Sequence, residues 1–241
     1  MIKTVLYAII FWVFMLISPL FFIPHFFLRI LGLEEQRRKY AALITTVSSK
    51  FVLWLCGADV TVRGLENMPE KRRDICYICN HQGYADIPLL IGYLPIKMGF
   101  IAKREIMFVP FFHIWMRSIK CIYINRKSHK SAIESIKRGV ESIKNGNPMY
   151  IAPEGRRSKS SNMGKFHPGS LKLAIRSNAL IIPVTIDGSY KLFEEKGLIS
   201  SAKVFLTIHK SIDTALLSPE EKKGLSNRLW KIINSSLKRS P

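Results

Sequence analysis

The sequence lacks charge near its N-terminus. Between Lys3 and Arg29 there is no Asp, Glu, Lys or Arg, and residues 5–17 are apolar around every face of a helix. A helix without a polar face is typical of a segment that lies in lipid. A secretory signal peptide is the alternative, but the apolar run outlasts a typical signal core and no A-x-A cleavage pattern follows it. We therefore expect a membrane-associated helical segment at the N-terminus.

Two prolines interrupt this apolar segment. Pro19 and Pro24 are expected to kink or break the helix, because proline lacks a backbone donor. One full span and a pair of half-inserted helices both fit such a segment. Basic residues are more numerous after the segment than before it, with Lys3 before and Arg29, Arg37, Arg38 and Lys39 after. The positive-inside rule then predicts a membrane location with the rest of the chain on the cytoplasmic face.

Acidic residues and cysteines are also scarce. The chain has 17 Asp and Glu against 37 Lys and Arg, a net charge of +20. Such a charge attracts nucleic acid, an anionic bilayer or an acidic substrate, and does not choose among them. The four cysteines are too few and too irregularly spaced for a disulfide framework, which favours a reducing compartment. With 241 residues, 48% of them hydrophobic, the chain can bury the core of one globular unit.

Cys76 and Cys79 form a C-x-x-C pattern, which is common in zinc and redox sites. They lie in an apolar run that is typical of a strand, where residues three apart point to opposite faces. Two sulfurs on opposite faces cannot bind one ion, and no second pair completes a set of four ligands. We therefore expect two buried core cysteines.

After the N-terminal segment, short β-branched or aromatic runs alternate with helical patterns. The predicted helices are residues 35–55, 130–144, 169–176 and 219–237, the last with Ser218 as its cap. The predicted strands are residues 60–62, 75–79, 100–102, 121–124, 149–152, 180–186 and 204–208. This order predicts an α/β fold, a mixed central sheet flanked by helices. We expect membrane-attaching helices in residues 1–56 and one α/β domain in residues 57–241.

A polar segment, residues 80–88, follows one of the predicted strands. The end of a strand that leads into a helix is where open α/β sheets place their sites. In one continuous helix His81 and Asp86 would lie about 140° apart around the axis. If Gly83 instead keeps the chain in a turn, the imidazole can fold back over the helix start and meet the carboxylate, which would fix its tautomer. No G-x-S-x-G nucleophile motif accompanies the pair.

Four blocks in this order resemble the glycerolipid acyltransferases, specifically the 1-acylglycerol-3-phosphate acyltransferase family. Residues 80–86 resemble the family's N-H-x-x-x-x-D block, and residues 120–126 resemble G-x-x-x-x-D-R. Residues 152–158 resemble F-P-E-G-T-R-S, and residues 182–184 resemble V-P-V. The resemblance covers about residues 60–189, and the apolar start also resembles the family's membrane-attaching helices.

The blocks are not complete. Lys120 replaces the glycine of the second block and Asn125 its aspartate, while Ala152 replaces the aromatic residue of the third block and Arg156 its threonine. The residues that match are His81, Asp86, Arg126, Glu154 and Arg157. The resemblance therefore implies the family's reaction more directly than its acceptor, because the altered blocks are the ones that hold the acceptor head group in the family.

The resemblance implies transfer of a fatty acyl group from acyl-CoA or acyl carrier protein to the sn-2 hydroxyl of lysophosphatidic acid. His81 would be the general base and Asp86 would orient it, with backbone amides near the helix start holding the oxyanion. The implied substrate-binding residues are Asn80, Arg126, Glu154, Gly155, Arg156 and Arg157. Arg126 and Arg157 would hold the phosphate, because a guanidinium fork fits its oxygens. No metal, bound cofactor or nucleic acid is implied.

Two alternatives remain open on the sequence alone. The substitutions in the second and third blocks fit a different lysophospholipid or a lyso-aminolipid as acceptor. The basic residues 156–159 could instead form a solvated loop on a non-catalytic, membrane-tethered protein that binds nucleic acid or anionic lipid. That alternative accounts for the charge but not for four ordered blocks.

Overall fold

The computed structural model describes residues 2–109, 112–125 and 127–237. Their strands form one eight-stranded sheet in the order β1-β7-β6-β2-β5-β3-β4, with β8 paired to β6. Strand β6 pairs antiparallel with β7 and β8, and the other pairings are parallel, so the predicted mixed sheet is confirmed. The strands are β1 (Ala58–Arg63), β2 (Ile75–Cys79), β3 (Gly99–Lys103), β4 (Ile122–Ile124), β5 (Met149–Ile151), β6 (Leu180–Asp187), β7 (Ala202–Ile208) and β8 (Ile212–Asp213).

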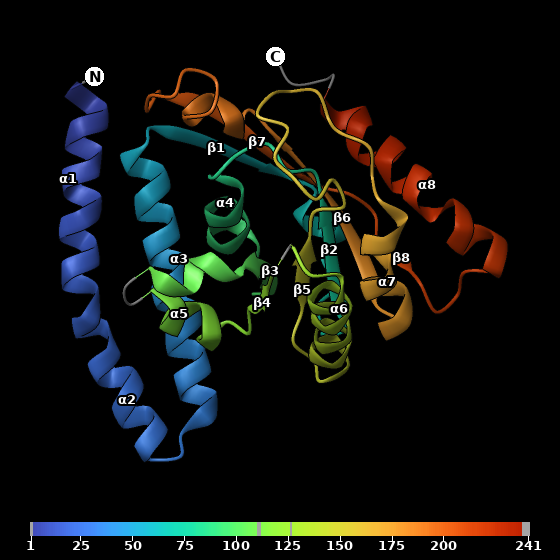
Figure 1. Ribbon diagram of the computed structural model, residues 1–241, viewed down its shortest axis with the longest axis horizontal. Coiled ribbons are helices and arrows are strands. Elements are labelled where there is room, and N and C mark those ends of the chain that lie inside the picture. The colour runs from blue at the N-terminus through green and yellow to red at the C-terminus, as the bar shows by residue number, and fades with distance from the viewer. Residues whose placement is uncertain (1, 110–111, 126, 238–241) are drawn as a thin grey trace.

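Helices cover both faces of the sheet (Figure 1). Helices α3, α4 and α5 bury their apolar side chains against one face, and α6, α7 and α8 bury theirs against the other. The helices are α1 (Ile2–Ile17), α2 (Phe22–Ile30), α3 (Glu34–Leu55), α4 (Asp86–Tyr93), α5 (Phe112–Ser118), α6 (His129–Lys144), α7 (Pro168–Ser177) and α8 (Pro219–Leu237). The result is a three-layer arrangement, with the sheet between two helical layers.

The C-x-x-C cysteines lie on opposite faces of β2, as predicted. Cys79 packs among the residues of the α3–α5 layer and Cys76 among those of the α6–α8 layer. Both thiols are free and buried, and burial raises the pKa of each above its usual value. They are core residues rather than a metal or redox pair.

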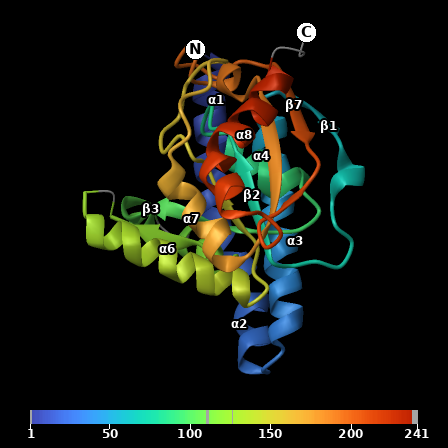
Figure 2. The same ribbon diagram turned by 90° about the vertical axis from the view of Figure 1, so that its right-hand side faces the viewer.

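The N-terminal helices form a separate column beside the α3–α5 layer. A 3-10 turn, Ser18–Phe21, with Pro19 in its first turn, separates α1 from α2, so the predicted break is confirmed there. Pro24 instead lies in the first turn of α2, where its missing donor is tolerated. Figures 1 and 2 both show the α2–α3 connection projecting beyond the rest of the molecule.

The apolar side chains of this column face outward. The helical run Thr4–Ile30 is long and apolar enough to cross a membrane, and little of it is buried. Trp12, Leu16, Phe26 and Phe27 are among its exposed large residues. An exposed apolar surface of this extent fits membrane association. The division into residues 1–56 and 57–241 stays a prediction, and α3 packs directly against α4.

Local signals set the ends of several helices. The predicted cap of α8 is confirmed: Ser218 Oγ accepts a hydrogen bond from the Glu221 amide (3.2 Å), and Glu221 Oε2 accepts one from the Ser218 amide (2.8 Å). This reciprocal pair is a capping box. Helix α6 begins after Ser128, whose hydroxyl accepts from the Ser131 amide. These ends position the loops that surround the candidate site.

Candidate active site

Three neighbouring strands deliver the polar residues of the site to one edge of the sheet. Strands β6, β2 and β5 lie side by side and are parallel, so their carboxyl ends meet. His81 follows β2, Glu154 follows β5, and Ser189 follows β6. The carboxyl edge of an open α/β sheet is the usual position of a ligand site.

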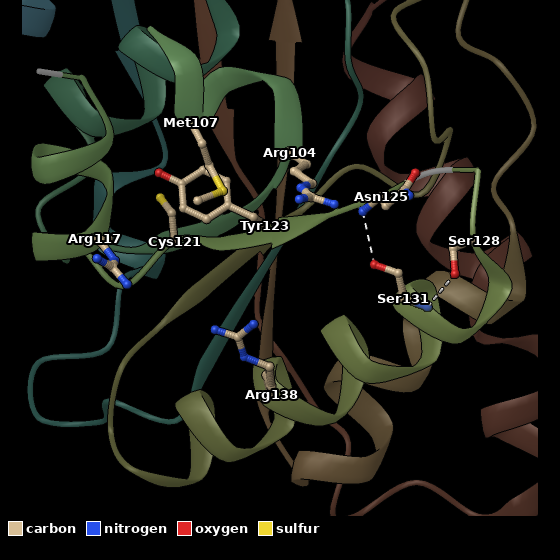
Figure 3. A pocket seen from close by; sticks show the side chains of 9 residues that line it. All are labelled: Arg104, Met107, Arg117, Cys121, Tyr123, Asn125, Ser128, Ser131 and Arg138. Atoms are coloured by element: carbon tan, nitrogen blue, oxygen red, sulfur yellow. Dashed lines mark hydrogen bonds between the residues drawn. The ribbon is translucent and has the colours of Figure 1, made fainter. Parts of the chain in front are cut away.

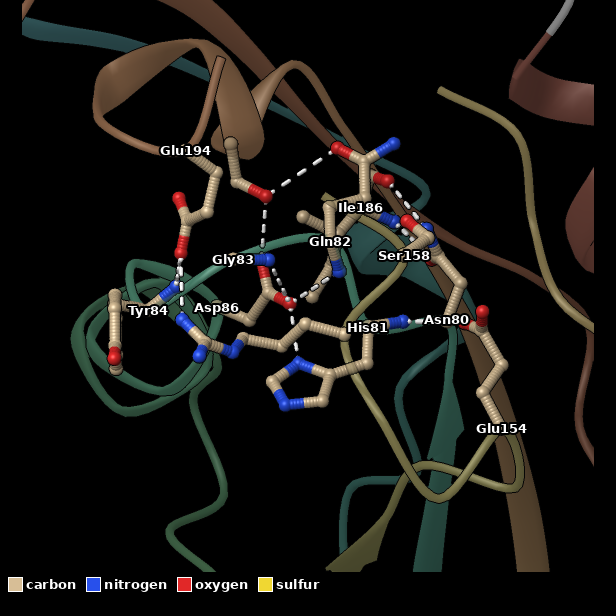
Figure 4. A network of polar contacts seen from close by, with 12 residues as sticks. Asn80, His81, Gln82, Gly83, Tyr84, Asp86, Glu154, Ser158, Ile186 and Glu194 are labelled. Atoms are coloured by element: carbon tan, nitrogen blue, oxygen red, sulfur yellow. Dashed lines mark hydrogen bonds and ion pairs between the residues drawn. The ribbon is translucent and has the colours of Figure 1, made fainter. Parts of the chain in front are cut away.

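His81 and Asp86 are in contact (Figure 4). The imidazole Nδ1 lies 2.7 Å from Asp86 Oδ2, so the expected fold-back over the start of α4 is confirmed. Because an ionised carboxylate only accepts hydrogen bonds, this contact places the proton on Nδ1 and leaves Nε2 as an acceptor. The His81 side chain is 20% exposed and lines a groove, whereas Asp86 is fully buried. One side of the imidazole is therefore held by the protein and the other faces the groove.

The buried carboxylate of Asp86 is surrounded by donors. Its Oδ2 also accepts from the backbone amides of Gln82 (2.7 Å) and Gly83 (3.0 Å), and its Oδ1 accepts from the Ser189 hydroxyl. Charge-assisted hydrogen bonds of this kind offset the cost of burying a charge. Three donors besides His81 therefore hold the Asp86 carboxylate in place.

Four backbone amides just before α4 donate to carboxylates of the protein. The amides of Gln82 and Gly83 point at Asp86, the His81 amide points at Glu154, and the Tyr84 amide donates to Glu194 Oε1 (2.7 Å). Four successive amides before α4 already have acceptors. They hold carboxylates of the protein in place and are not available to a substrate oxyanion in this conformation.

Glu154 joins the third block to the turn that carries His81. Its Oε1 accepts from the His81 amide and its Oε2 from the Gly164 amide, both at 2.7 Å. The Ser158 amide donates to the His81 carbonyl at 2.8 Å, which adds a second connection. Burial raises the pKa of Glu154, while the two amides oppose that shift. In this structure both carboxylate oxygens bind backbone, so Glu154 shapes the site.

Asn80 is also committed to the protein. Its Nδ2 donates to the Ile186 carbonyl and its Oδ1 accepts from the Ile186 amide, each at 2.8 Å. The side chain is buried, and its two hydrogen bonds to the backbone of β6 connect the turn to that strand. This explains physically why an amide precedes the histidine: it offers one donor and one acceptor to the backbone beside it.

The third block contributes two arginines to the lining of the groove. Arg157 Nη1 donates to Glu194 Oε1 at 2.9 Å, and its guanidinium lies 3.6 Å from the centre of the Tyr84 ring. Arg156 and Gly155 are exposed, and Gly155 has a φ of 70°, a left-handed conformation that favours glycine. All three block residues line the groove. Arg126 lies outside the described residues.

The groove has about 1580 Å³ of space and is lined by both apolar and basic side chains. Pockets for small ligands are typically about 300–1,000 Å³, so this one has room for a longer molecule. Its apolar lining comes from β3, β4 and α6 and includes Phe100, Ile101, Ile124, Ile133 and Ile136. Its basic lining includes Arg156, Arg157, Lys159, Lys165, Lys172 and Arg176. His81 lines the same groove.

Comparison with known proteins identifies the family. The family model described as Acyltransferase matches residues 59–187, which is more than half of the chain and includes both His81 and Glu154. The chain belongs to the acyltransferase family. It is therefore an enzyme, and the resemblance that the four sequence blocks carry is confirmed.

Named relatives of this acyltransferase are 1-acyl-sn-glycerol-3-phosphate acyltransferases. The 1-acyl-sn-glycerol-3-phosphate acyltransferase of Borreliella burgdorferi is 29% identical over 74% of this chain and 71% of its own length. The enzyme of that name from Pseudomonas aeruginosa is 36% identical over 56% of this chain and 53% of its own length.

A solved structure agrees with the whole fold. The crystal structure of the 1-acyl-sn-glycerophosphate acyltransferase of Thermotoga maritima has a TM-score of 0.84 and 26% identity. The match covers 99% of this chain and 94% of that one. The likeness therefore includes the N-terminal helices as well as the sheet.

Of the four residues that differ from the family blocks, two line the groove and two do not. Ala152 and Arg156 line the groove, where they can affect the ligand directly. Lys120 and Asn125 do not line it. Lys120 has a φ of 62°, the conformation for which glycine is favoured, so the family glycine is explained by backbone geometry rather than by substrate contact.

Sequence reasoning missed several residues of the site. Ser189 and Glu194 follow β6 and have no motif of their own, yet they bind Asp86 and Arg157. Lys103, at the end of β3, also lines the groove. The nearest signal was the V-P-V block, which marks β6 but not the residues after it.

Proposed function

We propose that this acyltransferase moves a fatty acyl group from a thioester donor to the sn-2 hydroxyl of lysophosphatidic acid, which gives phosphatidic acid. The observation that carries the proposal is the His81–Asp86 pair in a groove that is lined by both apolar and cationic side chains. An acyl chain fits the first lining and a phosphate the second. The names of the relatives agree with this acceptor.

In the proposed reaction His81 acts as general base. Its Nε2 accepts the proton of the acceptor hydroxyl as that oxygen attacks the thioester carbonyl carbon. A carbon–oxygen bond forms, the carbon–sulfur bond breaks, and the imidazolium returns the proton to the leaving thiolate. Asp86 keeps the imidazole in the reactive tautomer and stabilises its transient charge. No residue of the protein carries the acyl group.

The acceptor phosphate lies, in this proposal, against the basic part of the groove. Arg157 is held by Glu194 and Tyr84, so its orientation is set before the ligand arrives. One of its nitrogens is occupied by Glu194, and the planar fork keeps other donors for the phosphate. We assign Arg126 to the same phosphate on the family block alone. Arg156, Lys159 and Lys165 add an attractive field.

The donor and the location complete the proposal. Acyl-CoA and acyl carrier protein both present a thioester, and either fits the chemistry. The helices α1 and α2 hold the enzyme on the membrane, where lysophospholipids reside, with the catalytic domain on the cytoplasmic face. Asn80, Glu154 and Gly155 act in this scheme by shaping the turn and the loop that carry the reacting groups.

A different acceptor is the second candidate, and two observations favour it. Ala152 replaces an aromatic residue and Arg156 a threonine, and both line the groove. A smaller side chain and an added cation suit a larger or more anionic head group than lysophosphatidic acid. The chemistry at His81 stays the same under this alternative.

Complementation tests the proposed function. The chain and its His81→Ala variant are expressed in a bacterial strain that lacks 1-acylglycerol-3-phosphate acyltransferase activity, and the lipids are profiled by mass spectrometry. We expect the unmodified chain to restore growth and phosphatidic acid, and the variant at equal abundance to restore neither. Growth without conversion of lysophosphatidic acid, or a rise of another diacyl lipid instead, would contradict the acceptor assignment.

A further inference from the structure

A second pocket, of about 430 Å³, lies outside the groove at the free edge of the sheet (Figure 3). Strand β4 ends the strand order, and the pocket forms where α5, α6 and the segment after β3 approach it. Its lining residues are Arg104, Met107, Arg117, Cys121, Tyr123, Asn125, Ser128, Ser131 and Arg138. No Asp or Glu is among them.

The three arginines of this pocket come from three different elements. Arg104 follows β3, Arg117 lies in α5 and Arg138 lies in α6. Figure 3 shows them around Tyr123. Within residues 2–109, 112–125 and 127–237, none of the three makes an ion pair or a side-chain hydrogen bond. Three guanidinium groups in one pocket, without a carboxylate, form a lining that attracts an anion.

The remaining polar groups of the pocket also offer donors. Asn125 Oδ1 already accepts from the Lys127 amide (3.1 Å), which leaves the side-chain NH₂ to donate. The hydroxyl oxygens of Ser128 and Ser131 accept from backbone amides at 3.2 and 3.0 Å, so their hydrogens are available. The Tyr123 hydroxyl is buried and has no partner among the described residues. The start of α6 adds its positive dipole end.

This pocket is separate from the proposed catalytic groove. Side chains alternate along β4, so Tyr123 points away from the face to which Ile124 points. Ile124 lines the groove, whereas Tyr123 and Asn125 line the pocket. None of the residues lining the pocket lines the groove as well. A ligand of the pocket is therefore additional to the substrates of His81.

The surroundings of the pocket indicate where the anion comes from. Met107 lines the pocket, and its neighbour Phe108 is 77% exposed. Helix α5, which carries Arg117, packs against the membrane-associated α2: Trp115 stacks on Phe22 with ring centroids 4.6 Å apart. An exposed apolar side chain beside a cationic pocket suits a ligand that combines a phosphate with an acyl chain.

We propose that this arginine pocket binds the phosphate of an anionic phospholipid of the bilayer, with Met107 and Phe108 against its acyl chain. The contact holds the β4 edge of the sheet at the membrane surface, as a second attachment beside α1 and α2. The binding of this membrane lipid does not depend on which acceptor the catalytic site uses. An arginine near anionic lipid contributes about fivefold in affinity, so removing all three arginines should weaken binding about 100-fold.

Cross-linking with a photoactivatable lipid tests the proposal. The full-length protein in neutral detergent micelles is mixed with diazirine-labelled phosphatidic acid or phosphatidylcholine, and cross-linked peptides are mapped by mass spectrometry. The test variant carries Arg104→Gln, Arg117→Gln and Arg138→Gln. The matched control carries Lys223→Gln, Arg228→Gln and Lys231→Gln, which remove the same charge from exposed positions of α8. Cross-links in the groove serve as an internal measure of folding.

We expect phosphatidic acid to label residues 104–123 in the unmodified protein and in the α8 control. The arginine variant should need about 100-fold more lipid for equal labelling there, with groove labelling unchanged. Unlabelled phosphatidic acid should compete, and inorganic phosphate or coenzyme A should compete poorly. Equal labelling of all three proteins would overturn the proposal. Displacement by coenzyme A but not by phosphatidic acid would also overturn it, because the phosphate would then belong to a soluble ligand.

Discussion

The turn of residues 80–86 and the basic loop of residues 155–165 contribute to the lining of the same groove but differ in their hydrogen bonding. In the turn, the side chains of Asn80 and Asp86 are buried and saturated with hydrogen bonds, and His81 is held at Nδ1. In the loop, Arg156 and Lys159 are exposed and have no side-chain partner among the described residues. Arg157 is the exception, because Glu194 and Tyr84 hold it.

The difference fits the roles that we propose for the two regions. Proton transfer requires a fixed geometry, since small displacements of a base reduce its rate strongly. Attraction of a phosphate requires mainly positive charge, which acts over several ångströms without a fixed side chain. We therefore expect substitutions in the turn to reduce kcat, and substitutions in the loop to act mainly through the acceptor.

The largest expected effect comes from His81→Ala. A general base contributes about 10²- to 10⁴-fold, so kcat should fall by that factor while the protein stays folded. Steady-state release of thiol from oleoyl-CoA with lysophosphatidic acid measures it, and circular dichroism checks the fold. Retention of more than about a tenth of the original kcat would remove His81 from the mechanism.

The next effect is expected in the loop, at Arg157. A charge-assisted contact to the phosphate contributes about 1.5–3 kcal/mol, so Arg157→Ala should lower kcat/KM for lysophosphatidic acid about 10- to 100-fold. Arg157→Lys should recover only part of this, because an ammonium group does not reproduce the fork.

Arg156→Thr is the matched control for Arg157, since it removes one charge from the neighbouring exposed position. We expect a change of no more than a few-fold with lysophosphatidic acid, as for an exposed, screened charge. A large loss at Arg156 would indicate an additional anionic group on the acceptor and would favour the second candidate function. If Arg157→Ala leaves the preference between lysophosphatidic acid and a zwitterionic lysophospholipid unchanged, the phosphate assignment is wrong.

A smaller effect on kcat is expected at Ser189, which contacts Asp86 but lies outside the turn. Its hydroxyl donates to Asp86 and is fully buried, but Ser189 does not line the groove. Ser189→Ala should lower kcat about tenfold, which corresponds to one hydrogen bond to a charged group, and leave KM for both substrates nearly unchanged. A rise of KM with unchanged kcat would mean that Ser189 acts on binding and not on the position of Asp86.

The smallest expected effect concerns stability, at Lys120, which replaces a family glycine and does not line the groove. Lys120 has a φ of 62°, which costs a non-glycine residue about 1–2 kcal/mol. Lys120→Gly should therefore raise the unfolding free energy by up to about 1 kcal/mol, after the added chain entropy of glycine, with unchanged acceptor preference. Lys71→Gly, at an exposed loop position without a positive φ, should not stabilise the protein. Thermal unfolding in one detergent compares the three proteins.

Local patterns in the sequence predicted most of the fold. The seven predicted strands match β1–β7 within two residues at each end, and the four predicted helices match α3, α6, α7 and α8 within one. No range was predicted for strand β8 or for helices α4 and α5. They are two, eight and seven residues long, and such short elements carry too few periods of a hydrophobic pattern; for α4 only a start after Gly83 was expected.

The site was predicted only where its contacts are local. The pairing of His81 with Asp86 depends on five residues of one turn, and the spacing indicated it. Ser189 reaches Asp86, and Glu194 reaches Tyr84, across more than a hundred residues of sequence, through the order of β6 and β2 in the sheet. Spacing along the chain carries no signal for such contacts. The amides of residues 81–84 also donate to carboxylates of the protein.

The most direct test of the proposed acyl transfer uses the purified protein with oleoyl-CoA and an equimolar mixture of lysophosphatidic acid, lysophosphatidylethanolamine and lysophosphatidylcholine. Mass spectrometry of the diacyl products, with His81→Ala in parallel, measures activity and acceptor choice in one reaction. Phosphatidic acid should be the main product, and its formation should disappear in the variant. A different diacyl lipid as main product, or equal product from the variant, would contradict the account.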